Sequence, residues 1–408
     1  MTQRLPLEGV RVADFGWIIN APQTTLWLAA LGAEVIRVES RVYPDTMRVL
    51  PSGGPADGIT GLERNATYNW LNYSKKSISL NLGTQEGVEL AHRLIAKSDI
   101  VVEAFKGPDI EKFRLTWDEV RRTNPAAVLL SISLLGRTGP TKDWVGWGPM
   151  ALGTIGFSHA SGHPAGRPNR QVGGTWPDYS VANVLGFLTL SALRQARKTG
   201  EGQWIDAGMS DAVAGTIPEW YIEYAMNGRD LGRVGNEHPS MAPHGTYPCK
   251  GDDCWIAIAV QDDSQWAGLR EVLGLPDWAT HEHFADQYAR WAHRDDLDRL
   301  VAQTTQTMDR EKLFHSLQAA GVPAAPVLAL SEWVKDPHLA ARGYFWEMEH
   351  PEIGRRTMPG IPATFSEVEA FRYEAPPMLG QHTREVLREV LGVTEPELDR
   401  MERERILY

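Results

Sequence analysis

The sequence predicts an α/β protein built around a doubly wound parallel sheet. Short apolar runs typical of buried strands alternate, in the first half of the chain, with longer segments whose apolar residues recur at helical spacing. Strand, helix and strand follow one another within about thirty residues, the length of one parallel crossover unit. Sheets of this kind bind ligands in the loops beyond the carboxyl ends of their strands.

Each element follows from this alternation. In chain order we expect strand 10–15, helix 21–31, strand 34–39, helix 85–97, strand 100–105, helix 117–122, strand 127–133, helix 180–197, strand 203–209 and helix 211–227. Four loops should therefore lie at the ligand-binding edge of the sheet, namely 16–20, 40–47, 106–112 and 134–143.

A segment rich in Gly, Pro, His and Asn at 228–245 marks a change of domain. A strand at 254–260 and a helical pattern from 262 to 321 follow, which predicts a smaller α/β unit, and a polar helix is expected at 395–405. A chain of 408 residues exceeds one hydrophobic core. We expect a large domain at 1–225, a small α/β domain at 226–329 and a C-terminal extension at 330–408.

Composition excludes several classes of partner. The net charge is -11 and no long basic run occurs, which argues against nucleic acid, because phosphate binding needs clustered Lys and Arg. Cys249 and Cys254 suit neither a disulfide framework nor a four-ligand zinc site. The N-terminus lacks the features of a signal peptide, and no apolar run is long enough to span a bilayer. We expect a cytoplasmic protein with no membrane partner.

Four common catalytic signatures are absent from the sequence. The loop at 16–22 carries no GxGxxG, so a nicotinamide-linked oxidoreductase is rejected, and no GxxxxGK[ST] supports a P-loop NTPase. Neither HExxH nor GxSxG occurs, which removes the commonest zinc protease and serine hydrolase patterns. We expect no metal site.

Asp178 is the leading candidate for a nucleophile. It lies at or just before the N-cap of the helix expected at 180–197. Free backbone N–H groups and the positive end of the helix dipole favour the ionised carboxylate there, and an ionised carboxylate can act as a nucleophile. The alternative is that Asp178 only caps its helix, and the local sequence leaves both open.

Basic side chains follow several of the expected strands: Arg37, Arg41, Arg48, Lys75, Lys76, Lys106 and Lys112. If they converge at one sheet edge, they would offset the charge of the phosphates of a nucleotide-bearing cofactor. The aromatic residues interleaved with them would pack on an adenine or a pantetheine arm: Trp17, Tyr73, Phe105 and Trp147. Solvated charges and core aromatics are the competing explanations.

Six segments give the chain a resemblance to the class III CoA-transferase family, of which formyl-CoA and carnitine CoA-transferases are members. They are 7–15 (LEGVRVADF), 31–39 (LGAEVIRVE), 75–82 (KKSISLNL), 199–203 (TGEGQ), 336–339 (DPHL) and 379–383 (LGQHT). Together they are specific, and the match to the family covers nearly the whole chain. The segments 45–49 and 103–108 look most similar to the carnitine branch.

The resemblance implies an interlocked homodimer, in which a large Rossmann-like domain is made from both chain ends and a small domain is inserted between them. It also implies an acyl-CoA:carboxylate CoA-transferase of the EC 2.8.3 type with Asp178 as its catalytic residue. In the family mechanism this carboxylate forms a mixed anhydride and then an aspartyl-CoA thioester, which needs no metal and no permanent cofactor. Coenzyme A enters as a substrate.

Contacts to coenzyme A are implied position by position at Ile19, Asn20, Arg41, Asn72, Tyr73, Ser74, Lys75, Phe105, Lys106 and Lys112. The chain departs from the family pattern at three of its positions. Ile19 stands where relatives carry a polar residue, Ser40 where they carry Arg, and Ala104 where they carry Asn. The glycine-rich loop of the formyl-CoA enzyme is also absent at 235–240, so another segment must shield the anhydride from water.

Two other functions are compatible with this family resemblance. An α-methylacyl-CoA racemase needs an acid and a base, and the His-Asp pair of the racemases is missing at 146–148. A noncatalytic acyl-CoA-binding protein would not need Asp178. The sequence does not identify the acyl donor or the acid acceptor, although a basic residue such as Arg48, together with Trp17, Trp147 and Trp176, would suit a dicarboxylate.

Overall fold

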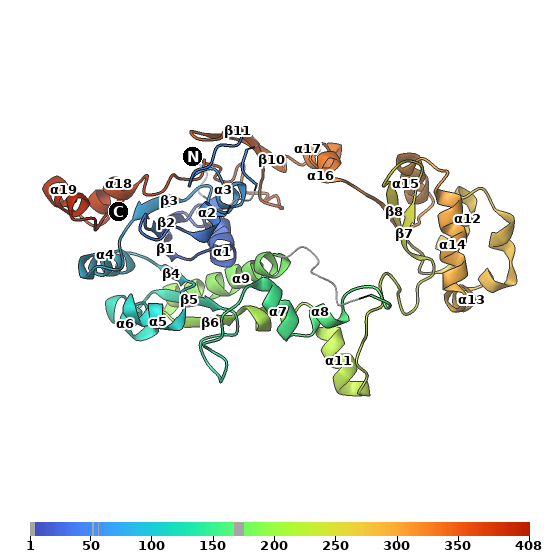
Figure 1. Cartoon of the computed structure of the whole chain (residues 1–408), viewed down its shortest axis with the longest axis horizontal. Helices are drawn as coiled ribbons and strands as arrows, with labels where there is room; N and C mark the ends of the chain where they lie inside the picture. Colours follow the sequence, from blue (N-terminus) through green and yellow to red (C-terminus); the bar gives the residue numbers. More distant parts are fainter. Residues whose placement is uncertain (1–4, 51–52, 56, 167–174) are drawn as a thin grey trace. The chain divides into compact units, whose positions relative to one another are not determined.

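A computed structural model describes residues 5–50, 53–55, 57–166 and 175–408. The chain divides into two compact units, the first made of residues 1–157, 170–229 and 342–408 and the second of residues 158–169 and 230–341. The first unit therefore contains both the blue N-terminal strands and the red C-terminal helices of Figure 1. The sequence-based prediction that the chain divides into domains at 225/226 and 329/330 stays a prediction.

A six-stranded parallel sheet forms the centre of the first unit, in the order β3-β2-β1-β4-β5-β6. Its strands are β1 (Arg11–Phe15), β2 (Glu34–Glu39), β3 (Lys76–Ser79), β4 (Ile100–Glu103), β5 (Val128–Ser133) and β6 (Trp204–Gly208). The α/β class and the parallel sheet are thus confirmed. The chain reverses its direction across the sheet between β1 and β4, the place where open α/β sheets bind ligands.

The helices of this unit connect the strands or follow the sheet. They are α1 (Asn20–Ala30), α2 (Thr46–Val49), α3 (Ala66–Leu71), α4 (Gln85–Ile95), α5 (Gly107–Lys112), α6 (Trp117–Thr123), α7 (Gly148–Thr154), α9 (Trp176–Thr199), α10 (Met209–Ala214), α11 (Pro218–Asn227), α18 (Thr383–Glu389) and α19 (Glu395–Arg403). A two-stranded hairpin, β10 (Phe345–His350) with β11 (Gly354–Pro359), completes the unit, and α8 (Phe157–Ala160) lies at its boundary.

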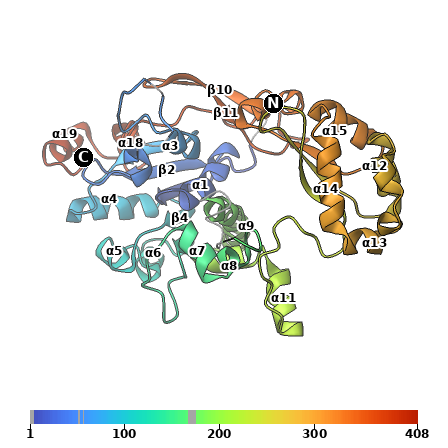
Figure 2. The same cartoon turned by 45° about the vertical axis from the view of Figure 1, so that its right-hand side comes forward.

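Each face of the sheet is covered by its own hydrophobic core. Alternate strand residues point to opposite faces, so that Val12 belongs to one core and Ala13 to the other. The first core joins the sheet to α1 and α9, which lie side by side in both views (Figures 1 and 2). The second core joins it to α4 and to the last two helices, through residues such as Val386 and Leu398.

The second unit is a small α/β body. Its antiparallel sheet consists of β7 (His244–Pro248), β8 (Trp255–Ala259) and β9 (Ala324–Val327). Its helices are α12 (Asp263–Val272), α13 (Gln287–Ala292), α14 (Arg294–Thr305), α15 (Arg310–Ala319), α16 (Leu330–Trp333) and α17 (Pro337–Ala341), with short 3-10 turns η1 (Asp277–Thr280) and η2 (Glu282–Phe284). Buried Trp266, Leu269, Leu297 and Leu313 belong to one core of its own.

Among the elements that differ from the sequence-based expectation, two lie in or beside the parallel sheet. The helix expected at 211–227 is two helices, α10 and α11, because Pro218 disfavours helical backbone at the residue before it and leaves Gly215 to Ile217 outside both. Strand β3 was not predicted, since Lys76–Ser79 is short and three of its four residues are polar. In the parts of the chain that the structure describes, no helix is long and apolar enough to cross a membrane.

Candidate active site

Helices α1 and α9 both begin at the carboxyl edge of the parallel sheet. Helix α1 follows β1 and so starts there, whereas α9 precedes β6 and must end at the opposite edge. Two contacts agree with this parallel arrangement, because Thr24 Oγ1 donates to the Ala182 carbonyl at 3.4 Å and Trp27 Nε1 donates to Asn183 Oδ1 at 2.9 Å. The first turns of the two helices are therefore neighbours.

Asp178 lies in the first turn of α9, three residues after the N-cap Thr175. The expectation that it sits at or before the N-cap is wrong, because Pro177 is accepted at the start of a helix and the helix begins earlier, at Trp176. Only 6% of the residue is exposed, and burial raises the pKa of Asp178 to about 6. The carboxylate is still mostly ionised at neutral pH.

Gly148, the first residue of α7, lies directly against this carboxylate. A Cβ atom at position 148 would be 2.3 Å from Asp178 Oδ2, closer than two such atoms can approach. Any side chain at position 148 would therefore displace the Asp178 carboxylate. Sequence reasoning used this segment only to exclude a His-Asp pair and missed the contact, which joins residues thirty positions apart and leaves no local signal.

An aromatic row runs along the loops at the same edge. The ring centroids of Trp17 and Tyr43 are 5.5 Å apart and stacked, those of Trp17 and Phe105 are 6.1 Å apart, and those of Phe105 and Phe113 are 5.1 Å apart. Lys112 Nζ lies 5.5 Å from the centroid of Phe113. The structure thus brings together Trp17, Phe105 and Lys112, three residues singled out from the sequence.

Two other predicted basic residues are exposed near these loops. Lys106 follows Phe105 and is the N-cap of α5. Arg41 follows β2, where its backbone N–H donates to the Tyr408 carbonyl at 3.0 Å and its Nη2 donates to the Leu379 carbonyl at 3.4 Å. Both side chains are exposed to solvent.

The predicted contacts at positions 72–75 are buried and have internal partners. Lys75 Nζ donates to the Pro22 carbonyl at 2.8 Å, to Thr25 Oγ1 at 2.8 Å and to Asn72 Oδ1 at 2.9 Å. Burial lowers the pKa of Lys75 to about 7, against the opposing effect of nearby Asp14. The ammonium group is thus a structural link to α1, and its contact with coenzyme A stays a prediction.

The two residues between them are similarly enclosed. Tyr73 packs against the rings of Trp346 and Tyr373, with centroids 5.3 and 5.8 Å away, and burial raises the pKa of its hydroxyl group. Ser74 Oγ donates to the Arg372 carbonyl at 2.8 Å. Tyr73 is therefore not part of the aromatic row, although the sequence grouped it with Trp17 and Phe105.

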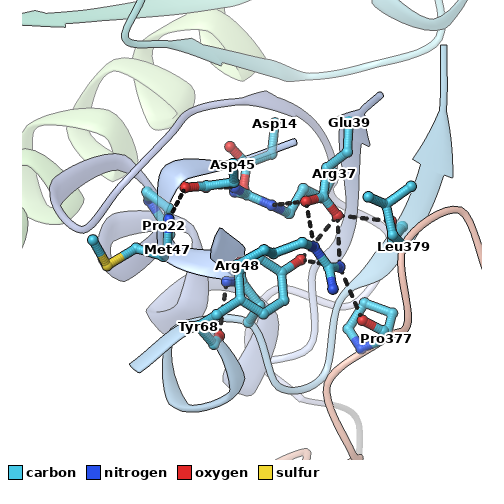
Figure 3. Close-up of polar contacts among 12 residues, drawn as sticks. Asp14, Pro22, Arg37, Glu39, Asp45, Met47, Arg48, Tyr68, Pro377 and Leu379 are labelled. Carbon is cyan, nitrogen blue, oxygen red and sulfur yellow. Dashed lines mark hydrogen bonds and ion pairs between the residues drawn. The ribbon is translucent and has the colours of Figure 1, made fainter. Parts of the chain in front are cut away.

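Arg37 and Arg48, which the sequence offered as candidates for a phosphate site, are fully buried in a network of ion pairs (Figure 3). Arg37 pairs with Asp45, and Arg48 Nε donates to Glu39 Oε1 at 2.9 Å. Burial alone would raise the pKa of Glu39, but Arg48 and Arg37 hold it at about 2. Neither guanidinium group is available to a phosphate or to a dicarboxylate in solvent.

This network fixes the loop after β1. Both carboxylate oxygens of Asp45 accept from the Ile18 N–H at 3.3 Å, and Asp45 Oδ1 also accepts from Met47 N at 2.8 Å. Ile18 has φ +69°, in the left-handed region that a β-branched side chain disfavours. The surroundings therefore impose a strained turn directly before Ile19 and Asn20.

Asn20 begins α1 with an unsatisfied side chain. The residue is 5% exposed, and among the described residues neither its Oδ1 nor its Nδ2 has a hydrogen-bond partner. A buried amide without partners costs free energy, so this position is suited to a polar ligand group. Ile19 beside it is buried in a small hydrophobic cluster against which Tyr179 of α9 packs.

The chain is similar to known proteins in both sequence and structure. Residues 7–383 match the model of CoA-transferase family III. The chain is 32% identical to the β subunit of succinyl-CoA–L-malate CoA-transferase from Chloroflexus aurantiacus, over 100% of this chain and 99% of that protein. It is 32% identical to succinate–glutarate CoA-transferase from Agrobacterium fabrum, over 94% and 96% of the two chains. The crystal structure of a CAIB/BAIF family protein from Brucella suis is similar to that of this chain, with a TM-score of 0.85 and 29% sequence identity. The alignment covers 95% of this chain and 100% of that protein.

Proposed function

Because the chain belongs to CoA-transferase family III and is a CoA-transferase, we propose that it moves coenzyme A between carboxylic acids by covalent catalysis at Asp178. The observation that carries this proposal is the carboxylate itself, buried beside Gly148 at the ligand-binding edge of the sheet. It retains its charge at neutral pH with a pKa of about 6. A partly desolvated carboxylate is a stronger nucleophile than one in water.

The reaction balances without metal or external acid. An oxygen of Asp178 attacks the thioester carbon, the C–S bond breaks, and the CoA thiolate leaves an acyl-aspartyl anhydride. The thiolate attacks the aspartyl carbonyl carbon, which forms the aspartyl-CoA thioester and releases the donor acid as its carboxylate. The acceptor carboxylate repeats the two steps in reverse order, which yields the new acyl-CoA and restores Asp178.

The proposed CoA site follows the exposed groups at the sheet edge. The aromatic row (Tyr43, Trp17, Phe105 and Phe113) offers ring faces to the adenine or the pantetheine arm, and Arg41, Lys106 and Lys112 offer charge to the phosphates. We propose that the amide of Asn20, which has no partner among the described residues, donates to the reacting acyl group. Asn72 to Lys75 are proposed to support this site from the protein interior, because Lys75 donates hydrogen bonds to α1.

Dicarboxylates are the proposed acids. The relatives named above act, by their names, on succinyl-CoA or succinate together with malate or glutarate. We therefore propose succinyl-CoA as donor and a four- or five-carbon dicarboxylate as acceptor. Arg48 is not assigned to the second carboxylate, since it is buried in the network of ion pairs.

The proposed active form is the interlocked dimer. Helix α11 has no buried residue in the isolated chain and exposes Ile222 (53%), Tyr224 (64%) and Met226 (77%). Phe187 on α9 is 70% exposed as well. Apolar side chains gathered on helices in this way are typical of a face covered by a second copy.

The test combines activity with trapping of the intermediate. Purified protein is incubated with succinyl-CoA and a panel of dicarboxylates, and the intermediate is trapped with hydroxylamine or borohydride and located by mass spectrometry. We expect acyl exchange and a modification at Asp178, both lost in Asp178→Asn and both kept in Asp295→Asn, which alters an exposed first-turn aspartate of α14. Absence of any adduct, or α-deuterium exchange without acid exchange, would refute the mechanism.

A further inference from the structure

The peptide groups on either side of Phe105 are held by a buried ion pair that the proposed chemistry does not use. Phe105 N donates to Glu103 Oε2 at 2.9 Å, and Arg137 Nη2 donates to the Phe105 carbonyl. The same nitrogen donates to Glu103 Oε1 and Oε2 at 3.2 and 3.0 Å. Glu103 and Arg137 thus close a ring of hydrogen bonds around the backbone of one residue.

Arg137 is itself fixed from a third strand. Its backbone N–H donates to Asp206 Oδ1 at 2.7 Å, and Thr138 Oγ1 donates to Asp206 Oδ2 at 3.3 Å. Asp206 belongs to β6, whereas Glu103 ends β4 and Arg137 follows β5. The loop that carries Phe105 is therefore tied to three adjacent strands of the sheet.

Stability alone does not account for such a pair. The side chains of Arg137 and Glu103 are 10% and 0% exposed, and the desolvation of two buried charges commonly consumes most of their mutual attraction. The pair instead fixes the conformation of the three-residue loop (104–106) that joins β4 to α5. This loop carries one ring of the aromatic row, Phe105, and one proposed phosphate contact, Lys106.

We propose that Arg137 is a positioning residue for coenzyme A, which holds the Phe105 backbone so that the Phe105 ring meets Trp17 and the Lys106 side chain faces the same ligand. This inference rests on the proposed function of the sheet edge. A loop held in its bound conformation before the ligand arrives loses less conformational entropy on binding. Arg137 should therefore affect the affinity for the CoA portion and leave the reacting carboxylate unchanged.

The test compares Arg137→Gln and Arg137→Lys with the wild-type protein. Loss of a charged hydrogen bond to the loop should raise the KM for acyl-CoA and the Kd for free CoA about tenfold. The kcat and the KM for the acid should stay within about threefold, because Asp178 is not touched. Hydrogen exchange at the Phe105 amide should accelerate in parallel. Arg137→Lys, which keeps the positive charge and an N–H donor group, should give a smaller change in the same direction.

Arg310→Gln is the matched control. Arg310 also pairs with a glutamate, Glu332, and donates to a backbone carbonyl, that of Val327, with a side chain 12% exposed, but it lies in the second unit. It should leave the KM, the Kd and the exchange of Phe105 unchanged.

Unchanged CoA affinity in Arg137→Gln would overturn the proposal, as would an equal loss of kcat and affinity. If that variant does not fold, Arg137→Lys decides in the same way. Failure of the proposed function is distinguishable, since the wild-type protein would then transfer no CoA, whereas the Kd for free CoA and the exchange rates would still report on Arg137.

Discussion

Asp178 has to be buried near a thioester and yet stay ionised. Burial favours the protonated acid, and the first turn of a helix favours the carboxylate. In this protein burial is the larger effect, because the pKa of Asp178 rises to about 6 instead of falling below its ordinary value. The position of the group at a helix start was foreseeable from the sequence, but the balance between the two effects was not.

The pKa of Asp178 predicts the pH dependence of the first step. Only the ionised carboxylate attacks, so kcat/KM for acyl-CoA should fall tenfold per unit of pH below about 6 and level off above it. Initial rates measured from pH 4.5 to pH 8 test this. A profile that stays flat down to pH 4.5 would contradict the assignment of Asp178 as the nucleophile.

Gly148→Ala should abolish most activity. The new methyl group would lie 2.3 Å from Asp178 Oδ2, so the carboxylate must move away from its position. A displacement on the order of 1 Å at a reacting group costs about a hundredfold in rate. Gly153→Ala is the control in the same helix, since no atom lies within 4 Å of its added methyl, and it should retain wild-type activity. Equal activity of the two variants, measured as acyl exchange, would refute the close contact.

At the scale of elements, α9 connects the site to the sheet. It extends from Trp176 to Thr199. Its C-cap is Gly200, whose φ of +79° lies in the left-handed region and terminates the helix. Helical periodicity and this glycine were sufficient to predict the body and the end of the helix. Its start was missed by four residues, because Trp176-Pro177 is as compatible with a loop as with a first turn.

Two glycines of α9 should respond to alanine with opposite signs. Gly200→Ala forces a side chain into the left-handed region and should lower the free energy of unfolding by about 1 kcal/mol. Gly186→Ala, inside the same helix and with no atom within 4 Å of the added methyl, should raise it by about 0.5–1 kcal/mol. Chemical denaturation of both variants gives the comparison. A gain in Gly200→Ala would show that the helix does not end as described.

Particular residues show what the sequence could not provide at this scale. The phosphate hypothesis included Arg37, Arg48 and Lys75 as basic residues near the sheet edge, yet all three are buried and paired. A basic residue in a single sequence has the same appearance whether it faces solvent or a carboxylate from a distant segment. Phe105 and Lys112 were placed correctly at the sheet edge because their loops follow directly from the order of the strands.

At the scale of the whole molecule, the fold class was predicted mainly from the order of strands and helices along the chain. Alternating strands and helices were enough for the class and the parallel sheet, and the family resemblance is confirmed by the match over residues 7–383. The hairpin β10–β11 and strand β7 were not predicted, since their residues are half exposed and show little apolar alternation.

Residues 230–341 should fold without the rest of the chain. They contain one continuous core and a complete three-stranded sheet. Expressed alone, they should unfold cooperatively on heating, with a near-ultraviolet signal from buried Trp266 that disappears in the same transition. A broad transition without that signal would show that the second unit depends on the first.

The second core of the parallel sheet has a consequence for synthesis in the cell. Strand residues such as Ala13 and Ile36 are made early, but their partners Val386, Leu398 and Ile406 are translated more than 340 residues later. Until those partners leave the ribosome, the part of this face that α4 does not cover presents apolar surface to its surroundings. The polypeptide should therefore depend on chaperones during translation, and ribosome stalling before residue 383 should leave it prone to aggregation.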